Sequence, residues 1–361
     1  MAKYFLNRIF RKKGPPIHLI WFVTSRCNLL CDHCFFHSEI KSDRNELSLD
    51  EIGRTINKLS PLLSISLTGG EPFIRDDLPE IARMISEKKL SQNLLLYSNG
   101  YNVSRVLESV EKIVSYCKGI RISIGVSIDG FQEEHDRYRN ANGSFIRALS
   151  TLQELKRMSG ACKNLNVGAN VTLHRGNQSI VKDLRKYIKE KAGVSLGMTI
   201  IRGVPKSMEL TKIDENICMD VMKEIEAEPI VDHKRKIFQS LVNTRVALGH
   251  RMAFDTYVYK RRSYECYAGS LMGIIYDNGD IFPCEMLPRA NMGNLRDYDY
   301  DLNKIWALTE SDNLRKWIKE KNCFCTFECQ YTCNTLYNKR NIPAFIINIL
   351  KDMRIKCGVE G

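Results

Sequence analysis

The chain has 361 residues, of which 43% are hydrophobic and 27% are charged, and this composition excludes a mostly disordered protein. The length predicts about two domains with sizeable cores. The 54 basic and 42 acidic residues give a net charge of +12, which favours anionic partners without choosing among them. Because the basic residues are scattered and no aromatic-interleaved basic patch occurs, we expect no nucleic-acid partner.

The cysteine content is the unusual part of the composition. Thirteen cysteines are too few for a small disulfide scaffold, too many for an average cytosolic enzyme, and odd in number. The sequence contains no run typical of a signal peptide and no 18 consecutive apolar residues that would span a membrane. We therefore expect a cytoplasmic protein, in which clustered, reduced cysteines bind metal or take part in chemistry.

The first predicted unit is a basic N-terminal segment, residues 1–16. Apolar and basic side chains mix there as in a short amphipathic helix, whose apolar members are Tyr4, Phe5, Leu6, Ile9 and Phe10. We expect this segment to dock on the rest of the protein. Peripheral contact with a membrane surface is the alternative.

Residues 17–204 alternate between short β-rich runs and stretches of helical period. We expect strands near 17–23, 63–67, 94–97, 121–128, 165–173 and 197–201, with helices between them. The first of the longer helices begins at a capping box formed by Ser48 and Glu51. Strands that alternate with helices predict a parallel sheet, and six such units make most of a barrel. The predicted fold is therefore α/β, a partial (β/α)6 barrel.

The pattern changes after the predicted sixth strand. Residues 205–263 are polar and helix-rich, which predicts a helical connector. Residues 264–361 are loop-rich and poor in apolar periodicity, and they contain Cys266, Cys284, Cys323, Cys325, Cys329, Cys333 and Cys357. Because such a region buries little apolar surface, we expect metal to stabilise it.

Three cysteines follow the first predicted strand with the spacing C-x3-C-x2-C: Cys27, Cys31 and Cys34. A tetrahedral zinc site takes four ligands, whereas an iron–sulfur cubane takes one thiolate per iron. Three thiolates therefore leave one iron free to bind a small chelating molecule. A zinc site with His33 or His37 as the fourth ligand is the alternative, although packing is the expected role of His33.

This spacing after a first strand closely resembles that of the radical S-adenosylmethionine (radical SAM) enzymes. The resemblance implies a [4Fe–4S] cluster whose open iron is chelated by SAM, and an external one-electron reductant of the flavodoxin or ferredoxin type. One electron then cleaves SAM to methionine and a 5′-deoxyadenosyl radical, which abstracts hydrogen from the substrate.

Further residues match this family at the carboxyl ends of the predicted strands, where barrel enzymes place their active sites. The resemblance implies SAM contacts from a GGEP motif and from the end of strand four: Gly69, Gly70, Glu71, Pro72, Ser127 and Asp129. Two more residues are candidate SAM contacts, and each has an alternative structural role. Arg139 either binds the SAM carboxylate or is a surface charge. Asn170 either contacts SAM or hydrogen-bonds a neighbouring loop.

The C-terminal cysteines resemble the SPASM extension of radical SAM enzymes, although the first two gaps in Cys323-x-Cys325-x3-Cys329-x3-Cys333 are shorter than is usual there. The resemblance implies one or two auxiliary [4Fe–4S] clusters. In its interleaved wiring the first cluster uses Cys266, Cys284 and Cys333, and its last iron is open, binds substrate, or takes an oxygen ligand such as Asp277 or Asp280. The second cluster uses Cys323, Cys325, Cys329 and Cys357. It departs more from the family pattern, because the gaps between its first cysteines are short. A structural zinc site is the alternative.

Glu285 directly follows Cys284. In the sulfatase-maturing relatives an aspartate at the matching position accepts the substrate proton, so the resemblance implies Glu285 as the catalytic base. A solvated surface glutamate is the alternative. We expect the three remaining cysteines, Cys117, Cys162 and Cys218, to be structural thiols.

The implied function is a radical SAM oxidoreductase that acts on a peptide or protein side chain, that is, a maturase. Oxidation or epimerisation of a small molecule, such as a sugar or aminoglycoside, is a second possibility. A non-enzymatic scaffold stabilised by iron–sulfur or zinc is the third. Only about 16 residues precede the first predicted strand, and this lack of a leader-binding domain counts against a peptide substrate.

Overall fold

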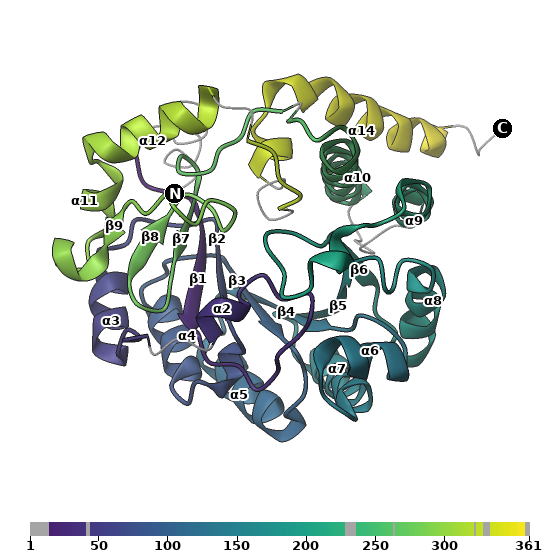
Figure 1. Ribbon diagram of the computed structural model, residues 1–361, viewed down its shortest axis with the longest axis horizontal. Coiled ribbons are helices and arrows are strands. Elements are labelled where there is room, and N and C mark those ends of the chain that lie inside the picture. Colours follow the sequence, from purple (N-terminus) through teal and green to yellow (C-terminus); the bar gives the residue numbers. More distant parts are fainter. Residues whose placement is uncertain are drawn as a thin grey trace.

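The structure is a computed structural model that describes residues 14–40, 44–227, 236–262, 264–320, 323–327 and 333–357. Within them one nine-stranded sheet has the order β6-β5-β4-β3-β2-β1-β7-β8-β9 (Figure 1). The strands are β1 (His18–Thr24), β2 (Ser64–Gly69), β3 (Asn93–Ser98), β4 (Arg121–Ser127), β5 (Leu165–Leu173), β6 (Leu196–Ile200), β7 (Met272–Ile275), β8 (Asp280–Phe282) and β9 (Gly293–Asn294).

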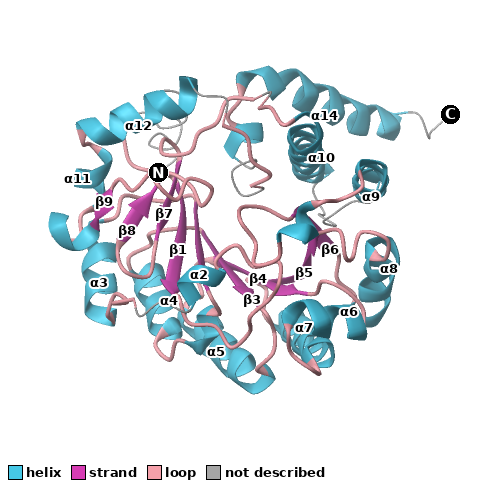
Figure 2. Cartoon of the chain, viewed as in Figure 1, coloured by secondary structure: helices cyan, strands magenta, loops and turns pink. Residues whose placement is uncertain are grey.

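Helices lie around the outside of this curved sheet (Figure 2). Those of the core are α2 (His37–Ile40), α3 (Leu49–Lys58), α4 (Leu78–Glu87), α5 (Val103–Tyr116), α6 (Gln132–Arg139), α7 (Ser144–Ala161) and α8 (Val181–Ala192). The later ones are α9 (Glu215–Ala227), α10 (Lys236–Tyr259), α11 (Leu302–Trp306), α12 (Thr309–Glu320) and α14 (Ile342–Cys357). Short 3-10 helices are η1 (Pro72–Ile74), η2 (Met208–Thr211), η3 (Leu295–Tyr298) and η4 (Lys339–Asn341).

The predicted α/β core is confirmed. Strands β1 to β6 pair in parallel, and helices connect successive strands. The edges β6 and β9 do not pair within the described residues, so the barrel is open. The capping box at Ser48 and Glu51 is also present. The predicted N-terminal amphipathic helix falls on residues 1–13, outside the described residues.

Residues 264–361 are more regular than their apolar pattern indicates. Strand β7 pairs in parallel with β1, so this part of the chain extends the core sheet, and β8 and β9 continue it in antiparallel fashion. Helices α11, α12 and α14 follow. None of the helices in the described parts of the chain is both long and apolar enough to cross a bilayer.

Strand β1 is buried on both faces, as its nearly continuous apolar sequence predicts. Leu19 and Trp21 pack in the core beneath the helices. Ile20 and Phe22 point to the other face, where they pack with residues of β7 and β8 and with residues that follow α12. The strand therefore contributes to two hydrophobic cores, one in the barrel unit and one shared with the C-terminal part of the chain.

A polar cluster connects the C-terminal part to helix α3. The Glu51 carboxylate accepts the backbone N–H of Ser48 at 2.9 Å and so completes the capping box. It also accepts Arg296 Nε at 2.6 Å and the Tyr300 hydroxyl at 2.8 Å. The hydrogen bond from Arg296 is the main reason why the pKa of Glu51 falls to about 2. One carboxylate thus joins a helix start in the core to η3 in the C-terminal part.

We expect Glu51→Gln to lower the free energy of unfolding by about 1 kcal/mol, because a neutral amide loses the charge-assisted bonds. The folded-state pKa of Glu51 is lowered from 4.5, so its contribution is fully present above that pH and is lost as the pH falls toward 2. The measurement is the midpoint temperature of thermal unfolding under argon. The difference in this temperature between variant and wild type should be the same near pH 8 as near pH 5.

Glu80→Gln is the matched control, since it removes a helix-surface pair with Arg83 whose side chains are 39% and 42% exposed. This variant should change stability by less than about 0.5 kcal/mol. Equal effects of the two variants would show that the Glu51 cluster does not stabilise the junction.

Candidate functional site

A cavity of about 200 Å³ opens at the carboxyl ends of the parallel strands. We call it the strand-end cavity. It is lined by residues that end or follow β1, β2, β3, β4 and β6, among them Cys27, Cys31, Cys34, Gly69, Gly70, Glu71, Asn99, Ser127, Arg139 and Arg202. The structure thus brings together the cysteine triplet, three residues of the GGEP motif, Ser127 and Arg139. Pro72 is buried beside them as the first residue of η1.

The three cysteines of this cavity are partly buried free thiols. Burial raises the pKa of Cys27 and of Cys34 to about 12, so a group that supplies positive charge is needed to hold them as thiolates. The cavity wall contains three cysteines and no fourth, which fits a cubane with one open iron. Among the described residues no three His, Cys, Asp or Glu side chains converge on the position of a single metal ion.

The two glycines of the GGEP motif bring the end of β2 against the cysteine loop. The N–H of Gly70 donates to the carbonyl of Thr24 at 3.0 Å, and the N–H of Glu71 donates to that of Arg26 at 2.9 Å. A Cβ at Gly70 would lie 2.2 Å from the Arg26 oxygen, and Gly69 has a φ of +150°. Both glycines also line the strand-end cavity, so the missing side chains leave room there as well as for the protein's own backbone.

Gly70→Ala should therefore displace the cysteine loop. Overpacking of this kind costs about 1–3 kcal/mol, and a cost of this size borne by SAM binding raises the dissociation constant for SAM roughly 5- to 160-fold. The measurement is SAM binding to anaerobically prepared protein, together with its iron content. The matched control is Gly168→Ala in β5, where an added Cβ meets no atom within 4 Å. Equal SAM affinities for both variants would contradict this account of the glycines.

The carboxylate of Glu71 connects the segment after β2 to the end of β3. It accepts the N–H of Asn99 at 2.6 Å, the hydroxyl of Ser98 at 3.0 Å and the N–H of Phe73 at 3.3 Å. Burial outweighs these bonds and raises the pKa of Glu71 to about 7. Asn99 in turn donates to the side chain of Asn28 in the cysteine loop at 2.8 Å. Asn99 was not predicted as a site residue from the sequence. Its position directly after β3 is the feature that could have indicated it.

A buried ion pair lies beside the triplet. Arg139 donates to Asp129 through Nη2 at 2.6 Å and through Nε at 2.8 Å, and the two residues are 5% and 0% exposed. The N–H of Thr172 donates to the other oxygen of Asp129 at 2.8 Å. Burial opposes the charge of Asp129, but Arg139 holds the pKa of this carboxyl below its usual range. The surface-charge alternative for Arg139 is therefore wrong, and Asp129 orients Arg139 rather than lining the cavity itself.

Two other sequence candidates differ in position: His33 lines the strand-end cavity, whereas Asn170 does not. His33 Nε2 lies 3.4 Å from the Asp129 carboxylate, and the ring stacks on His174 with centroids 5.5 Å apart. This arrangement matches the packing role expected for His33. Asn170 lies in β5 and donates to Thr199 of β6 at 3.4 Å, and its side chain does not line the strand-end cavity.

A second group of cysteines lines a separate cavity, which we call the four-cysteine cavity: Cys266, Cys284, Cys323 and Cys325. Cys266 precedes β7, and antiparallel β8 returns the chain so that Cys284 lies near it. The other two cysteines follow α12. Burial raises the pKa of the Cys266 thiol to about 12 and that of Cys284 well above its usual value. Four cysteines around one cavity fit a cubane with one thiolate per iron.

This grouping differs from the interleaved wiring, which assigns Cys323 and Cys325 to another cluster than Cys266 and Cys284. Cys333 is buried in the hydrophobic core shared with the C-terminal part and does not line the four-cysteine cavity. Asp277 and Asp280 do not line it either: Asp277 faces Arg44 at 3.0 Å, and Asp280 accepts Asn294 at 2.9 Å. Cys329 and the side chain of Cys357 lie outside what the structure describes.

Glu285 is buried and paired with a residue of the strand-end cavity. Arg202, which follows β6, donates to its carboxylate at 3.1 Å, and the Glu285 side chain is 3% exposed. Burial raises the pKa of Glu285 although Arg202 opposes the shift. The Arg202 guanidinium lies over the rings of Phe35 and Phe327, at 4.9 and 5.1 Å from their centroids. The surface-glutamate alternative is wrong, and the pair links the strand-end cavity to the residue beside Cys284.

Residues 21–177 match the profile of the Radical SAM superfamily. The matched residues contain most of the α/β sheet, with the cysteine triplet after its first strand and the GGEP motif after its second, and these features define the radical SAM class. The superfamily uses a [4Fe–4S] cluster together with SAM.

Two proteins of Methanosarcina barkeri and one of Bacillus subtilis are among the relatives. The AdoMet-dependent heme synthase is 27% identical over 82% of this chain and 84% of that protein. The Bacillus sporulation killing factor maturation protein SkfB is 26% identical over 86% and 69%. Fe-coproporphyrin III synthase is 33% identical over 50% of this chain, and the chain spans only 43% of its length.

Solved structures share the fold. Streptococcus suis SuiB bound to the precursor peptide SuiA has a TM-score of 0.61 and 16% identity, covering 87% of this chain and 70% of that one. The structure of anSMEcpe with bound AdoMet has a TM-score of 0.58 and 17% identity, covering 94% and 98%. At this identity the likeness concerns the fold alone.

Proposed function

We propose that this protein is a radical SAM maturase that oxidises a peptide or protein side chain. The observation that carries the proposal is the Arg202–Glu285 pair, which connects the strand-end cavity to the residue that follows Cys284 of the four-cysteine cavity. Hydrogen abstraction at the first cavity leaves a substrate that must lose a proton and an electron. The Glu285 carboxylate would accept the proton, and a cluster that includes Cys284 would accept the electron. The similarity to the maturation protein SkfB supports the substrate class.

Cys27, Cys31 and Cys34 would hold the cluster that binds SAM. When bound, this group supplies the one-electron cleavage of SAM that produces a hydrogen-abstracting radical. Arg139, oriented by Asp129, places a fixed cation beside the triplet, where it can bind a carboxylate. Glu71 holds the loop after β2 against the end of β3 through its carboxylate and against the cysteine loop through its backbone N–H, so that a ligand meets a preformed cavity.

Glu285 is the proposed base. Its burial next to Cys284 removes competing water, and Arg202 fixes the orientation of its carboxylate. The four-cysteine cavity would hold an auxiliary [4Fe–4S] cluster that accepts the electron left on the substrate. The proton acceptor Glu285 would then adjoin Cys284, a ligand of the cluster that accepts the electron. One oxidation step could therefore use both acceptors.

The first test replaces Cys27, Cys31 and Cys34 with Ala. Protein reconstituted under argon should lose about four of roughly eight irons and all dithionite-dependent formation of 5′-deoxyadenosine, because the cluster that binds SAM is removed. The measurements are iron and sulfide analysis and chromatography of the nucleoside. Wild-type protein that forms no 5′-deoxyadenosine would overturn the proposed function.

The matched variant replaces Cys266 and Cys323 with Ser. It should lose a similar amount of iron but still cleave SAM, because the four-cysteine cavity is separate from the strand-end cavity. Loss of all iron in either variant would mean that the two cysteine groups do not form separate sites.

Glu285→Gln should keep the cleavage of SAM but lower product formation by about 100-fold or more, as is typical when a general base is removed. Glu285→Asp should restore part of it. The measurement is product mass per 5′-deoxyadenosine formed. Glu265→Gln is the control, since Glu265 adjoins Cys266 as Glu285 adjoins Cys284. If both amide variants keep the wild-type ratio, Glu285 is not the base.

A second candidate substrate is a tetrapyrrole side chain. The similarity to the AdoMet-dependent heme synthase favours it, because that match covers 84% of the relative's length. Turnover assays with short peptides encoded near the gene, and with Fe-coproporphyrin III, separate the two candidates. A mass change on the porphyrin alone would replace the peptide assignment.

A further inference from the structure

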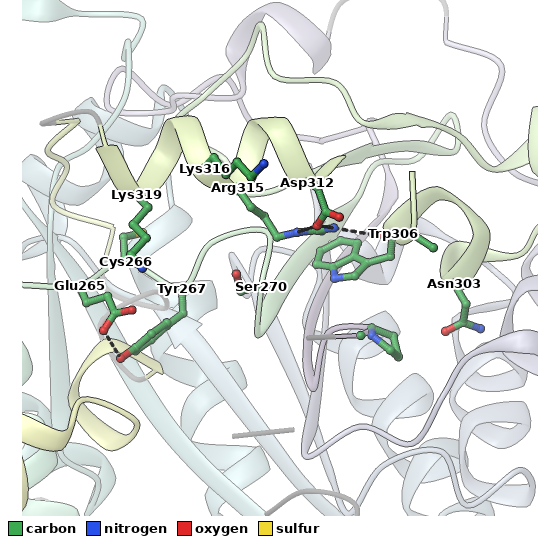
Figure 3. A pocket seen from close by; sticks show the side chains of 13 residues that line it. Glu265, Cys266, Tyr267, Ser270, Asn303, Trp306, Asp312, Arg315, Lys316 and Lys319 are labelled. Atoms are coloured by element: carbon green, nitrogen blue, oxygen red, sulfur yellow. Dashed lines mark hydrogen bonds and ion pairs between the residues drawn. The ribbon is translucent and has the colours of Figure 1, made fainter. Parts of the chain in front are cut away.

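A groove of about 590 Å³ lies beside the four-cysteine cavity (Figure 3). We call it the basic groove. It is lined by residues that precede β1 and β7 and by residues of α11 and α12, among them Pro15, Cys266, Trp306, Arg315, Lys316 and Lys319. A hollow of about 360 Å³ adjoins it, and the two share Glu265, Cys266 and Lys319 as lining residues.

Cations outnumber carboxylates on this surface. Both carboxylates already have partners: Asp312 pairs with Arg315 at 2.8 Å, and Glu265 accepts the Tyr267 hydroxyl at 2.9 Å. The groove and the hollow therefore present a positive field that attracts an anionic partner. The cations that line them among the described residues are Arg262, Arg315, Lys316, Lys319 and Arg340.

Two of these arginines are already engaged by the protein itself. Besides Asp312, Arg315 donates to the carbonyls of Gly269 at 3.0 Å and of Trp306 at 2.7 Å. Arg262 donates to the carbonyl of Ile318 at 3.0 Å. Proteins often recognise phosphate through two parallel bonds from a free guanidinium. Because both guanidinium groups are used by the protein, the surface is poorly suited to a compact phosphate ligand.

The other three cations extend along the surface. Lys316 and Lys319 are exposed on α12 and Arg340 is exposed on η4, and none of them has a carboxylate partner among the described residues. A lysine presents a charge on a flexible stem rather than a rigid recognition fork. Such spread, adaptable cations suit several carboxylates along a chain, which favours an acidic stretch of polypeptide.

The groove lies away from the chemistry. Gly14 and Pro15 of its lining precede β1, whereas the cysteine triplet follows the other end of that strand. Strand β1 has seven residues, so the two places are separated by about 20 Å or more. An extended chain covers at most about 3.3–3.6 Å per residue, so at least about six residues must separate a segment held in the groove from a side chain that reacts in the strand-end cavity.

We propose that the basic groove binds an acidic segment of the peptide or protein substrate, at least about six residues away from the side chain that reacts. Binding at the groove makes the second encounter intramolecular, so it raises the local concentration of the reacting side chain at the strand-end cavity. The groove contributes to the affinity for the substrate and takes no part in the chemical step. This inference rests on the peptide or protein substrate of the proposed function.

The test measures binding of fluorescein-labelled hexaglutamate to the holoprotein by fluorescence anisotropy at low salt. Lys316→Glu/Lys319→Glu should raise the dissociation constant about tenfold or more, because attraction at two positions becomes repulsion. Binding to the wild type should weaken as salt is added.

Lys118→Glu/Lys163→Glu is the matched control, because it makes the same change of net charge on exposed lysines before β4 and β5. It should keep the wild-type affinity, and equal iron contents would show that both double variants fold. Equal affinities of the two variants for hexaglutamate would overturn the proposal. Tighter binding of inorganic tripolyphosphate than of hexaglutamate would also overturn it and assign the groove to a phosphate ligand.

A second measurement uses the peptide that the turnover assays identify as the substrate. Lys316→Glu/Lys319→Glu should raise its KM about tenfold and leave kcat unchanged, because only remote binding is lost. A substrate without an acidic stretch at the stated spacing, or an unchanged KM, would refute the groove and leave the proposed function intact. Modification of Fe-coproporphyrin III alone would instead refute the peptide substrate, and with it the premise of this inference.

Discussion

The site depends on the close contact between the end of β2 and the cysteine loop. Without side chains at Gly69 and Gly70, two backbone N–H groups reach the carbonyls of Thr24 and Arg26. Glu71, the next residue, then extends the connection to the loop after β3. A cluster needs its thiols held in fixed positions before the metal arrives. Here backbone contacts and one buried carboxylate provide that fixed frame.

Two buried ion pairs set the electrostatics around this frame. Asp129–Arg139 and Arg202–Glu285 each place a guanidinium at the strand-end cavity and its carboxylate partner farther from it. Buried pairs contribute little net stability, because desolvation offsets their attraction. In this protein the two ion pairs serve to position the arginine side chains. Each acid fixes the direction of an arginine, so the cavity contains oriented cations that suit an anionic ligand.

Local features of the site could be predicted from the sequence, and long-range ones could not. The cysteine triplet, the GGEP motif and the Ser48 capping box are contiguous patterns whose geometry is set within a few residues. The grouping of Cys266 and Cys284 with Cys323 and Cys325 depends on the antiparallel return of β8 and on the position of α12, which no spacing records. The burial of Arg139, and its partner, likewise follow from how helix α6 packs on the sheet.

The pairing of β1 with β7 has a consequence for how the two cysteine groups relate. The triplet follows the carboxyl end of β1, while Cys266 precedes the amino end of β7, its direct neighbour in the sheet. A hydrogen-bonded strand pair hardly stretches. The paired strands therefore fix where the loop with the cysteine triplet begins relative to where the loop with Cys266 ends, and the distance between the two cysteine groups depends only on those two loops.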